Sequence, residues 1–318
     1  METVQMDIAE KRKLTASSQK KSGKLRGIAR KDLFWGYLMI APLMLGLLIF
    51  YIWPVFQTFY FSFTSWGPFG NYQWTGLVNY QHLLSDPTLG QALRNTFIFT
   101  VLSVAGSMVV SLFVATLLNR KIRGLVVYRT IYFLPTVTMP AAIAIVWQWL
   151  YNGDYGLINY FLSLFSLHGP RWLTDPNIAL YSITLIAIWG SIGNNMILFL
   201  AGLQSIPSVY YEAASLDGAG PAHKFFRVTL PLLSPTIFFV TVTSLISAFQ
   251  VFDLIYLLFG TSDVVINSTQ TVVYLFYKSA FVDNDKGYAA GIAMFLFVII
   301  LIVTIIQLQL QKRWVHYA

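Results

Sequence analysis

Six long apolar segments limit what this chain can fold into. Each is long enough to cross about 30 Å of hydrocarbon as a helix, at about 1.5 Å per residue. The composition agrees, since 56% of residues are hydrophobic and 11% charged, against about 25% charged in soluble domains. The sequence therefore predicts one all-α integral membrane protein with six transmembrane helices, at 33–63, 97–118, 130–150, 178–203, 232–259 and 288–310.

The N-terminal region divides into a polar tail and the first apolar segment. Residues 1–32 are rich in Lys, Arg and Ser, which predicts a disordered cytoplasmic tail. A signal peptide is the competing interpretation, but segment 33–63 is too long for its hydrophobic part and no small-residue cleavage site closes it. We therefore expect an uncleaved first helix.

The basic residues predict the orientation. Lys and Arg near helix ends are retained in the cytoplasm, and here they alternate from one connecting segment to the next. This places both termini in the cytoplasm, and it assigns the net charge of +8 to the membrane surface rather than to nucleic acid. The predicted cytoplasmic set beyond the tail is Arg120, Lys121, Arg123, Arg129, Lys224, Arg227, Lys312 and Arg313, whereas the external segments hold Arg94, Arg171, Lys278 and Lys286.

The connecting segments complete the predicted organisation. Residues 64–96 form a Gly- and Pro-containing external loop, long enough to receive a soluble partner. Residues 97–310 hold the other five helices and include a cytoplasmic segment at 204–231, and 311–318 form a cytoplasmic C-terminus.

Segment 204–231 carries two helix signals in succession. Pro207 suits the first turn of one short helix, Gly218 suits its C-terminal end, and Pro221 suits the start of a second helix. These positions predict a helix-turn-helix outside the bilayer.

Two interpretations of this helix-turn-helix follow from its residues. Ala213 and Ala214 permit close backbone approach, Leu216 and Phe226 supply apolar contacts, and Glu212 offers a carboxylate to a cationic partner. Such a segment could enter a groove in another protein. The alternative is an amphipathic helix resting on lipid headgroups.

The spacing within this segment resembles the signature cytoplasmic loop of permeases from binding-protein-dependent ABC importers. A Glu-Ala-Ala triplet is followed by a glycine, an aliphatic residue and a Leu-Pro pair at fixed distances. The family often has isoleucine at the aliphatic position, where this chain has valine. The matching residues are Glu212, Ala213, Ala214, Gly218, Val228, Leu230 and Pro231.

This resemblance implies a fold and a set of partners. Members have the type I ABC importer permease fold in a bacterial-type inner (cell) membrane. They pair with a second, related permease, two cytoplasmic ATPases and an external solute-binding protein. The loop enters a cleft of the ATPase and transmits its ATP-driven closure to the membrane helices. By this resemblance the chain needs no cofactor of its own, because the partner ATPase binds ATP and Mg.

Further stretches resemble the carbohydrate branch of the family, which includes maltose-type and glycerol-phosphate-type permeases. This implies a sugar or oligosaccharide cargo, with a polyol, glycerol phosphate or another small solute as the alternative. One departure is the sequence 259–263, where the branch usually has a Gly-Gly-Pro turn. The matching stretches are Ala41-Pro42, Trp53-Pro54, Ser62-Phe63, Asn79-Tyr80, Leu93 to Thr96, Tyr132 to Pro135, Trp147 and Tyr155 to Asn159.

The chain is not predicted to be an enzyme. A phosphate-binding loop needs Gly-x-x-x-x-Gly-Lys-Ser/Thr, and here Gly23-Lys24 is followed by Leu25. The histidines are scattered outside the predicted spans, and the chain has no cysteine, so no metal site is predicted.

A few polar residues inside the predicted spans mark a candidate substrate pathway. Asp253 is the one Asp, Glu, Lys or Arg well inside a span, where a charge is costly. Gln250 and Tyr256 lie three residues to either side and would share its helix face, and Asn194 and Asn195 add amides. Together these five could bond sugar hydroxyls and cover sugar C–H faces. The alternative role for Asp253 is a structural bond between helices or contact with the second permease.

A secondary transporter or channel, with Asp253 as its ion or proton site, is the competing functional class. Such a protein would carry its solute without partner subunits. It has no need of a Glu-Ala-Ala loop, so that motif favours the importer.

Overall fold

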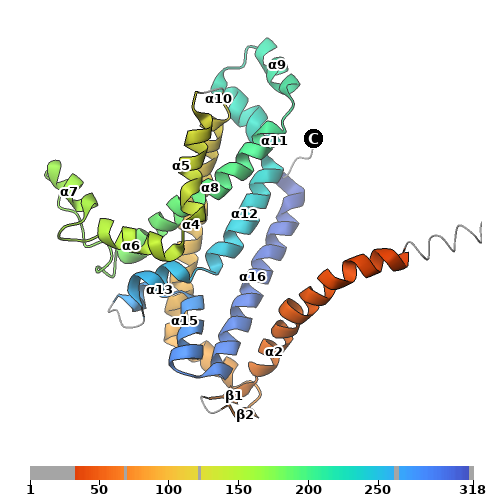
Figure 1. Cartoon of the computed structure of the whole chain (residues 1–318), viewed down its shortest axis with the longest axis vertical. Helices are drawn as coiled ribbons and strands as arrows, with labels where there is room; N and C mark the ends of the chain where they lie inside the picture. The colour runs from red at the N-terminus through yellow and green to blue at the C-terminus, as the bar shows by residue number, and fades with distance from the viewer. Residues whose placement is uncertain (1–32, 68–69, 121–122, 261–264, 315–318) are drawn as a thin grey trace, which may run out of the picture. The chain divides into compact units, whose positions relative to one another are not determined.

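The computed structural model describes residues 33–67, 70–120, 123–260 and 265–314 (Figure 1), and these divide into two compact units between Thr58 and Phe59. The first predicted span is confirmed as a helix, Leu33–Phe61, although the predicted tail lies outside the described residues. A π-helical stretch, η1 (Leu48–Ile52), precedes α2 (Trp53–Phe61). Pro54 lacks an N–H and crowds the preceding turn, and a wider turn accommodates it.

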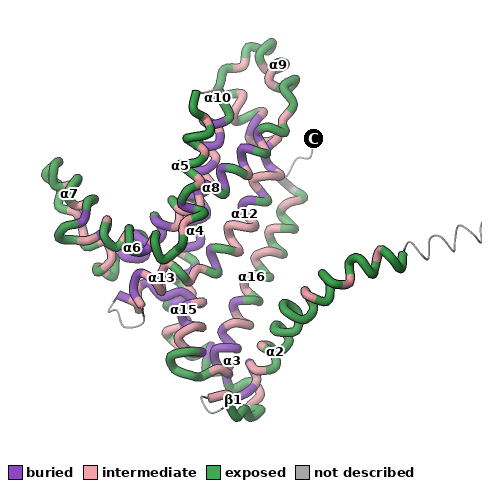
Figure 2. The backbone as a smooth tube through the Cα atoms, viewed as in Figure 1, coloured by how far each residue is buried: buried purple, intermediate pink, exposed green. Residues whose placement is uncertain are grey.

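Four long helices form the core of the second unit (Figure 1). They are α4 (Pro87–Leu118), α8 (Ala179–Gln204), α12 (Ser234–Phe249) and α16 (Lys286–Trp314). Buried residues run along α4 and α8 (Figure 2); Phe99 and Ile183 belong to one buried cluster, and Val114 and Met196 to another. Their apolar residues therefore form the core between helices, and other faces stay exposed.

Small residues bring the core helices close together. A Cβ at Gly193 of α8 would lie 2.8 Å from Phe133 Cα and would also meet the Tyr132 carbonyl, both on α5 (Leu125–Val137). On α4, a Cβ at Gly106 would meet the Ile188 side chain of α8. Glycine permits the close approach of backbones that stabilises helix pairs in lipid.

The second predicted span begins earlier than expected, at Pro87 instead of residue 97. The Asp86 side chain accepts a hydrogen bond from the Thr88 amide at 2.8 Å, and Pro87 follows at the first helical position. This is a favourable helix start. The predicted external loop therefore contains the first turns of α4, preceded by an antiparallel hairpin of β1 (Thr64–Trp66) and β2 (Tyr72–Trp74) and by α3 (Val78–Ser85).

The hairpin and α3 are fastened to the start of α16. The Asn79 amide donates to the carbonyls of Ser62 and Thr64 at 2.9 and 2.8 Å, and Tyr288 donates to Asp86 at 2.7 Å. Burial raises the pKa of the Asp86 carboxyl, but hydrogen bonds from Tyr288 and Thr88 and the charge of His82 lower it overall. In Figure 1 this end lies opposite to α9 (Ser208–Leu216) and α10 (Pro221–Lys224).

The third predicted span, 130–150, is wrong as a single straight helix. α5 ends at Val137, and α6 (Pro140–Leu150) turns away from it by 100°. Pro140 disfavours helical geometry at the residue before it, and Met139 has ψ of 133°. A short helix, α7 (Leu157–Leu164), follows α6.

The fifth predicted span, 232–259, is also interrupted. α12 ends at Phe249, and α13 (Asp253–Phe259) starts after a short break. The Thr271 hydroxyl donates to the Val251 carbonyl at 2.9 Å and holds the broken backbone. Beyond it lie α14 (Ile266–Thr269), α15 (Val272–Tyr277) and the π-helical η3 (Lys278–Val282). The described residues contain five helices long and apolar enough to span a membrane, with Ser234–Phe259 counted as one despite its interruption, or six if the bent α5–α6 pair is one span.

Gly193→Ala should destabilise the detergent-purified protein, because the new Cβ meets the α5 backbone. Overpacking of this kind costs about 1–3 kcal/mol. Gly190→Ala is the matched control on the same helix, where a Cβ meets nothing within 4 Å and alanine improves helix propensity by up to about 1 kcal/mol. Thermal unfolding midpoints followed by tryptophan fluorescence compare the two. Equal midpoints would contradict the close α5–α8 contact.

Candidate functional site

A cavity of about 540 Å³ lies where the two broken helices meet the core. The break between α5 and α6 and the break between α12 and α13 both contribute to its wall, together with α4 and α8. Its size falls within the about 300–1,000 Å³ typical of small-molecule sites. Broken helices within a membrane are tolerated where their backbone lines such a cavity.

Four of the five predicted pathway residues line this cavity. Asn194 and Asn195 come from α8, and Gln250 and Asp253 come from the break before α13. Asn195 is buried and its amide lies 3.4 Å from the Ser244 hydroxyl, whereas the other three are exposed in the single chain. The expected shared helix face of Gln250 and Asp253 is wrong, because α12 ends before Gln250 and α13 starts at Asp253.

Tyr256, the fifth predicted residue, stands behind the cavity in an aromatic ladder. Its ring stacks on Phe252, which lines the cavity, at 5.3 Å between centroids. Tyr277 lies 5.0 Å from both rings, and Phe281, which is 65% exposed, lies 5.4 Å from Tyr277. The ladder thus leads from the exposed Phe281 on η3 to the cavity wall.

Hydroxyl side chains make up a large part of the lining that sequence reasoning missed. Ser103 and Ser107 are four residues apart on α4, which places them on one face, and each donates to a carbonyl of its own helix. Hydroxyls in apolar helices are common, so their convergence is visible only in the structure. Of the described residues that line the cavity, Asp253 is the one charged side chain. Besides Ser103 and Ser107, the lining residues with hydroxyl groups are Thr136, Thr138, Ser191, Thr243, Ser244 and Ser247.

The Glu-Ala-Ala segment, residues 204–231, folds as the predicted helix-turn-helix. Pro207 stands just before α9 rather than in its first turn. Gly218 has φ of +76°, and the amides of Gly218 and Ala219 donate to the carbonyls of Ser215 and Ala214 at 3.1 and 2.9 Å. This pair of bonds is a Schellman motif, which favours glycine at the left-handed position.

The second helix starts at Pro221, as expected, and continues from α10 through η2 (Phe225–Thr229) and α11 (Leu230–Leu232). Two side-chain contacts fasten it to α9. Lys224 Nζ donates to Ser215 Oγ at 2.7 Å, and the hydroxyls of Tyr211 and Thr229 are 3.1 Å apart. The segment is therefore a bonded unit rather than a simple connector.

Most residues of this segment are exposed in the single chain (Figure 2). Leu216 is 90% exposed and Phe226 is 63% exposed. Glu212, Ala213 and Gly218 are exposed on the same segment, while the other matching residues, Ala214, Val228, Leu230 and Pro231, are half-buried. Exposed apolar residues around a carboxylate fit a protein contact better than a free surface.

The comparison with known proteins decides the family. Residues 124–316 match the family model described as the inner membrane component of binding-protein-dependent transport systems. The chain belongs to this family. Among the described residues of this permease, no group of three or more His, Asp or Glu side chains is placed to hold a metal ion.

Relatives extend the match over most of the chain. The "Probable ABC transporter permease protein YesP" of Bacillus subtilis (strain 168) is 35% identical over 95% of this chain and 97% of its own. The "sn-glycerol-3-phosphate transport system permease protein UgpA" of Pectobacterium atrosepticum is 34% identical over 88% of this chain and 95% of its own. The resemblance to glycerol-phosphate-type ABC permeases is thus confirmed.

A solved structure confirms the fold. A chain of a bacterial ABC transporter involved in the import of the acidic polysaccharide alginate superposes with a TM-score of 0.79, at 23% identity, over 89% of this permease and 96% of that chain. The permease is therefore a mostly helical, multi-pass membrane protein with the importer permease fold, and its family is a transport component rather than a catalytic one.

Gly218→Ala should loosen the turn between α9 and α10. A non-glycine residue in the left-handed region costs about 1–2 kcal/mol, so the Ala219 amide should exchange its hydrogen roughly 5–30 times faster. Gly220→Ala is the control, because Gly220 has φ of −72° and open space around it. Hydrogen–deuterium exchange of peptides covering 208–224 measures both. Equal effects would contradict the Schellman geometry.

Proposed function

We propose that this permease is one of two membrane subunits of an ATP-driven importer that carries a neutral sugar or oligosaccharide. The observation that carries this proposal is the cavity at the two helix breaks. Its lining offers amides, hydroxyls and one carboxylate, next to an aromatic ladder. This combination matches a polyhydroxylated molecule, whose hydroxyls both donate and accept hydrogen bonds and whose C–H faces pack on rings.

Each kind of lining group has a role in binding sugar. An ionised Asp253 accepts only, so it would take hydrogen bonds from two sugar hydroxyls. Ser103 and Ser107 already donate to their own helix, and their oxygens keep lone pairs for further donors. Asn194 can donate and accept at once, and Phe252 supplies an aromatic face.

The charge of the cavity favours a neutral cargo over an anionic one. Phosphate and carboxylate groups are typically bound by Arg or Lys, and the described lining contains neither. Asp253 would repel an anion. Relatives named for sn-glycerol-3-phosphate make that solute the second candidate. Binding its phosphate would require basic groups from the other subunit, because this lining has none.

The remaining partners are proposed from the surfaces that are exposed in the single chain. Asn194, Gln250 and Asp253 are exposed, so a second, related permease would close the other side of the cavity. Two cytoplasmic ATPases, which bind ATP and Mg, would cover the exposed face of the Glu-Ala-Ala segment. An external solute-binding protein would deliver the sugar. Both termini then lie in the cytoplasm, with the permease in the cell (inner) membrane.

Affinity purification in mild detergent tests the assembly. A tagged chain should bring down a second permease and an ATPase, identified by mass spectrometry. The complex reconstituted in liposomes should show ATPase activity stimulated by a sugar-loaded binding protein. Recovery of this chain alone, active without ATP, would instead favour an ion-coupled carrier with Asp253 as its site.

Glu212→Lys should uncouple the complex. The exposed carboxylate would contribute a charge-assisted contact to the ATPase, and losing it costs about 1.5–3 kcal/mol, so stimulated ATPase activity and uptake should fall roughly 10–100-fold. Asp217→Lys is the control, an equal charge change at an exposed position on the same segment but outside the motif. Retained coupling in Glu212→Lys would overturn the assignment.

Asp253→Asn should weaken transport while leaving assembly intact. The amide keeps the shape but loses the charge that strengthens bonds from sugar hydroxyls, and a loss of roughly 10-fold or more in transport kcat/KM is expected. Asp175→Asn is the control, because Asp175 only caps an exposed turn at Asn177. Glycerol 3-phosphate should not compete with the sugar for uptake. Faster uptake of this anion by Asp253→Asn would make the phosphate the better candidate.

A further inference from the structure

The bent third span ends in an arm formed by residues 140–169, comprising α6, α7 and the loop after it. α5 has 13 residues, which gives about 20 Å at 1.5 Å per residue, less than the about 30 Å of the hydrocarbon core. α6 then turns by 100°. If α5 follows the membrane normal, α6 runs close to the membrane plane, and α7 lies beyond it.

Much of this arm is exposed (Figure 2), and apolar side chains are prominent among its exposed residues. On α6, Ile145 and Val146 are 66% and 53% exposed, and on α7, Phe161 and Leu164 are 54% and 61% exposed. From Tyr155 to Leu167 the sequence contains no charged residue. Exposed apolar side chains thus occur on α5, on α6 and on α7 in turn.

The arm is held in a defined conformation. The Asn159 amide donates to the carbonyls of Gly153 and Pro170 at 3.0 and 3.2 Å, and its oxygen accepts from Trp172 Nε1 at 2.7 Å. Trp172 stacks on Tyr151 at 5.3 Å. A helix fixed in this way presents its apolar side chains permanently, so something must cover them.

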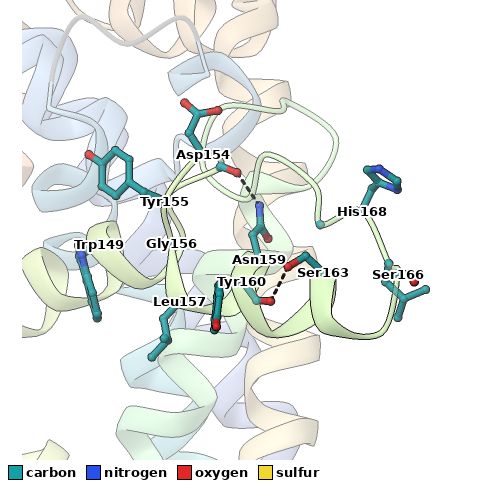
Figure 3. A pocket seen from close by; sticks show the side chains of 13 residues that line it. Trp149, Asp154, Tyr155, Gly156, Leu157, Asn159, Tyr160, Ser163, Ser166 and His168 are labelled. Carbon is teal, nitrogen blue, oxygen red and sulfur yellow. Dashed lines mark hydrogen bonds between the residues drawn. The ribbon is translucent and has the colours of Figure 1, made fainter.

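The arm has an apolar side and a polar side. A cavity of about 840 Å³ lies between α7 and the loops at its two ends. Figure 3 shows Trp149, Leu157 and Tyr160 pointing to one side, whereas Asp154 and His168 point to the other. Aromatic residues at the boundary of an apolar face, with ionisable residues opposite, are typical of segments at headgroup level.

We propose that the α6–α7 arm lies in the external lipid–water interface, with its apolar side among the acyl chains and with Asp154 and His168 in water. A lipid surface fits better than a protein partner for two reasons. The face continues the exposed apolar surface of α5, and the uncharged stretch 155–167 offers a protein no charge to complement. The arm, residues 140–169, then acts as an outer-leaflet anchor rather than as an aqueous loop.

The absence of cysteine from the chain allows a direct test. Phe161→Cys and Leu164→Cys each carry an environment-sensitive fluorophore in the full complex, reconstituted in nanodiscs of phosphatidylcholine with or without brominated acyl chains. The unsubstituted complex, treated identically, serves as the blank for cysteines of other subunits. Asp154→Cys is the control on the polar side, and Leu216→Cys is a control on the Glu-Ala-Ala segment.

The expected result is blue-shifted emission at 161 and 164, with brominated lipid quenching at least twofold, and little quenching at 154 and 216. Because positions 161 and 164 are labelled separately, the test can still be made if one of the two variants fails to assemble. Blue-shifted emission without quenching would overturn the proposal in favour of a protein cover, and water-like emission without quenching would overturn it in favour of an aqueous loop. The test needs no cargo, so it is independent of the proposed substrate.

Discussion

The rest of this structure depends on one constraint: within hydrocarbon, every backbone N–H and C=O must find a partner. Continuous helices satisfy this alone, and α4 and α8 are unbroken through the core. A break is tolerated only where other groups replace the lost bonds. Both interior breaks, at Thr138–Met139 and at Gln250–Phe252, border the same cavity. The two helix breaks thus lie at the polar cavity of the permease.

The same constraint shapes the polar side chains. A serine inside a membrane helix is costly unless its hydroxyl donates, and Ser103 and Ser107 donate to carbonyls one turn back. Their oxygens still accept bonds. A buried hydroxyl can also donate to a carbonyl outside its own helix. Tyr274, which is 1% exposed, donates to the Gly260 carbonyl at 2.7 Å. A wall of this kind is stable when empty and still able to bind hydroxyl groups.

Hydropathy alone predicted most spans, and turn chemistry predicted Gly218 and Pro221, because these signals are local. The start of α4 had a local signal in Asp86 and Pro87, which a hydropathy count ignores because polar residues follow it; these are satisfied by distant partners, as when Asn95 donates to the Gln270 carbonyl at 3.0 Å. The break after Phe249 depends on Thr271 in the same way. The α5–α6 bend had a signal in Pro140, which a count of apolar residues ignores. In the site, asparagines and Asp253 stood out as rare, whereas the serines and threonines did not.

The geometry also constrains how a coupling segment could act on the cavity. α8 runs without interruption from Asn194 to Gln204, about 15 Å at 1.5 Å per residue, and the Glu-Ala-Ala segment follows directly. At that end a Cβ on Gly202 would meet Leu233 and Thr236, so α8 and the start of α12 are in close contact. Both helices carry cavity residues further along. A displacement of the segment would therefore move these two walls together, relative to the walls that α4 and the α5–α6 break contribute.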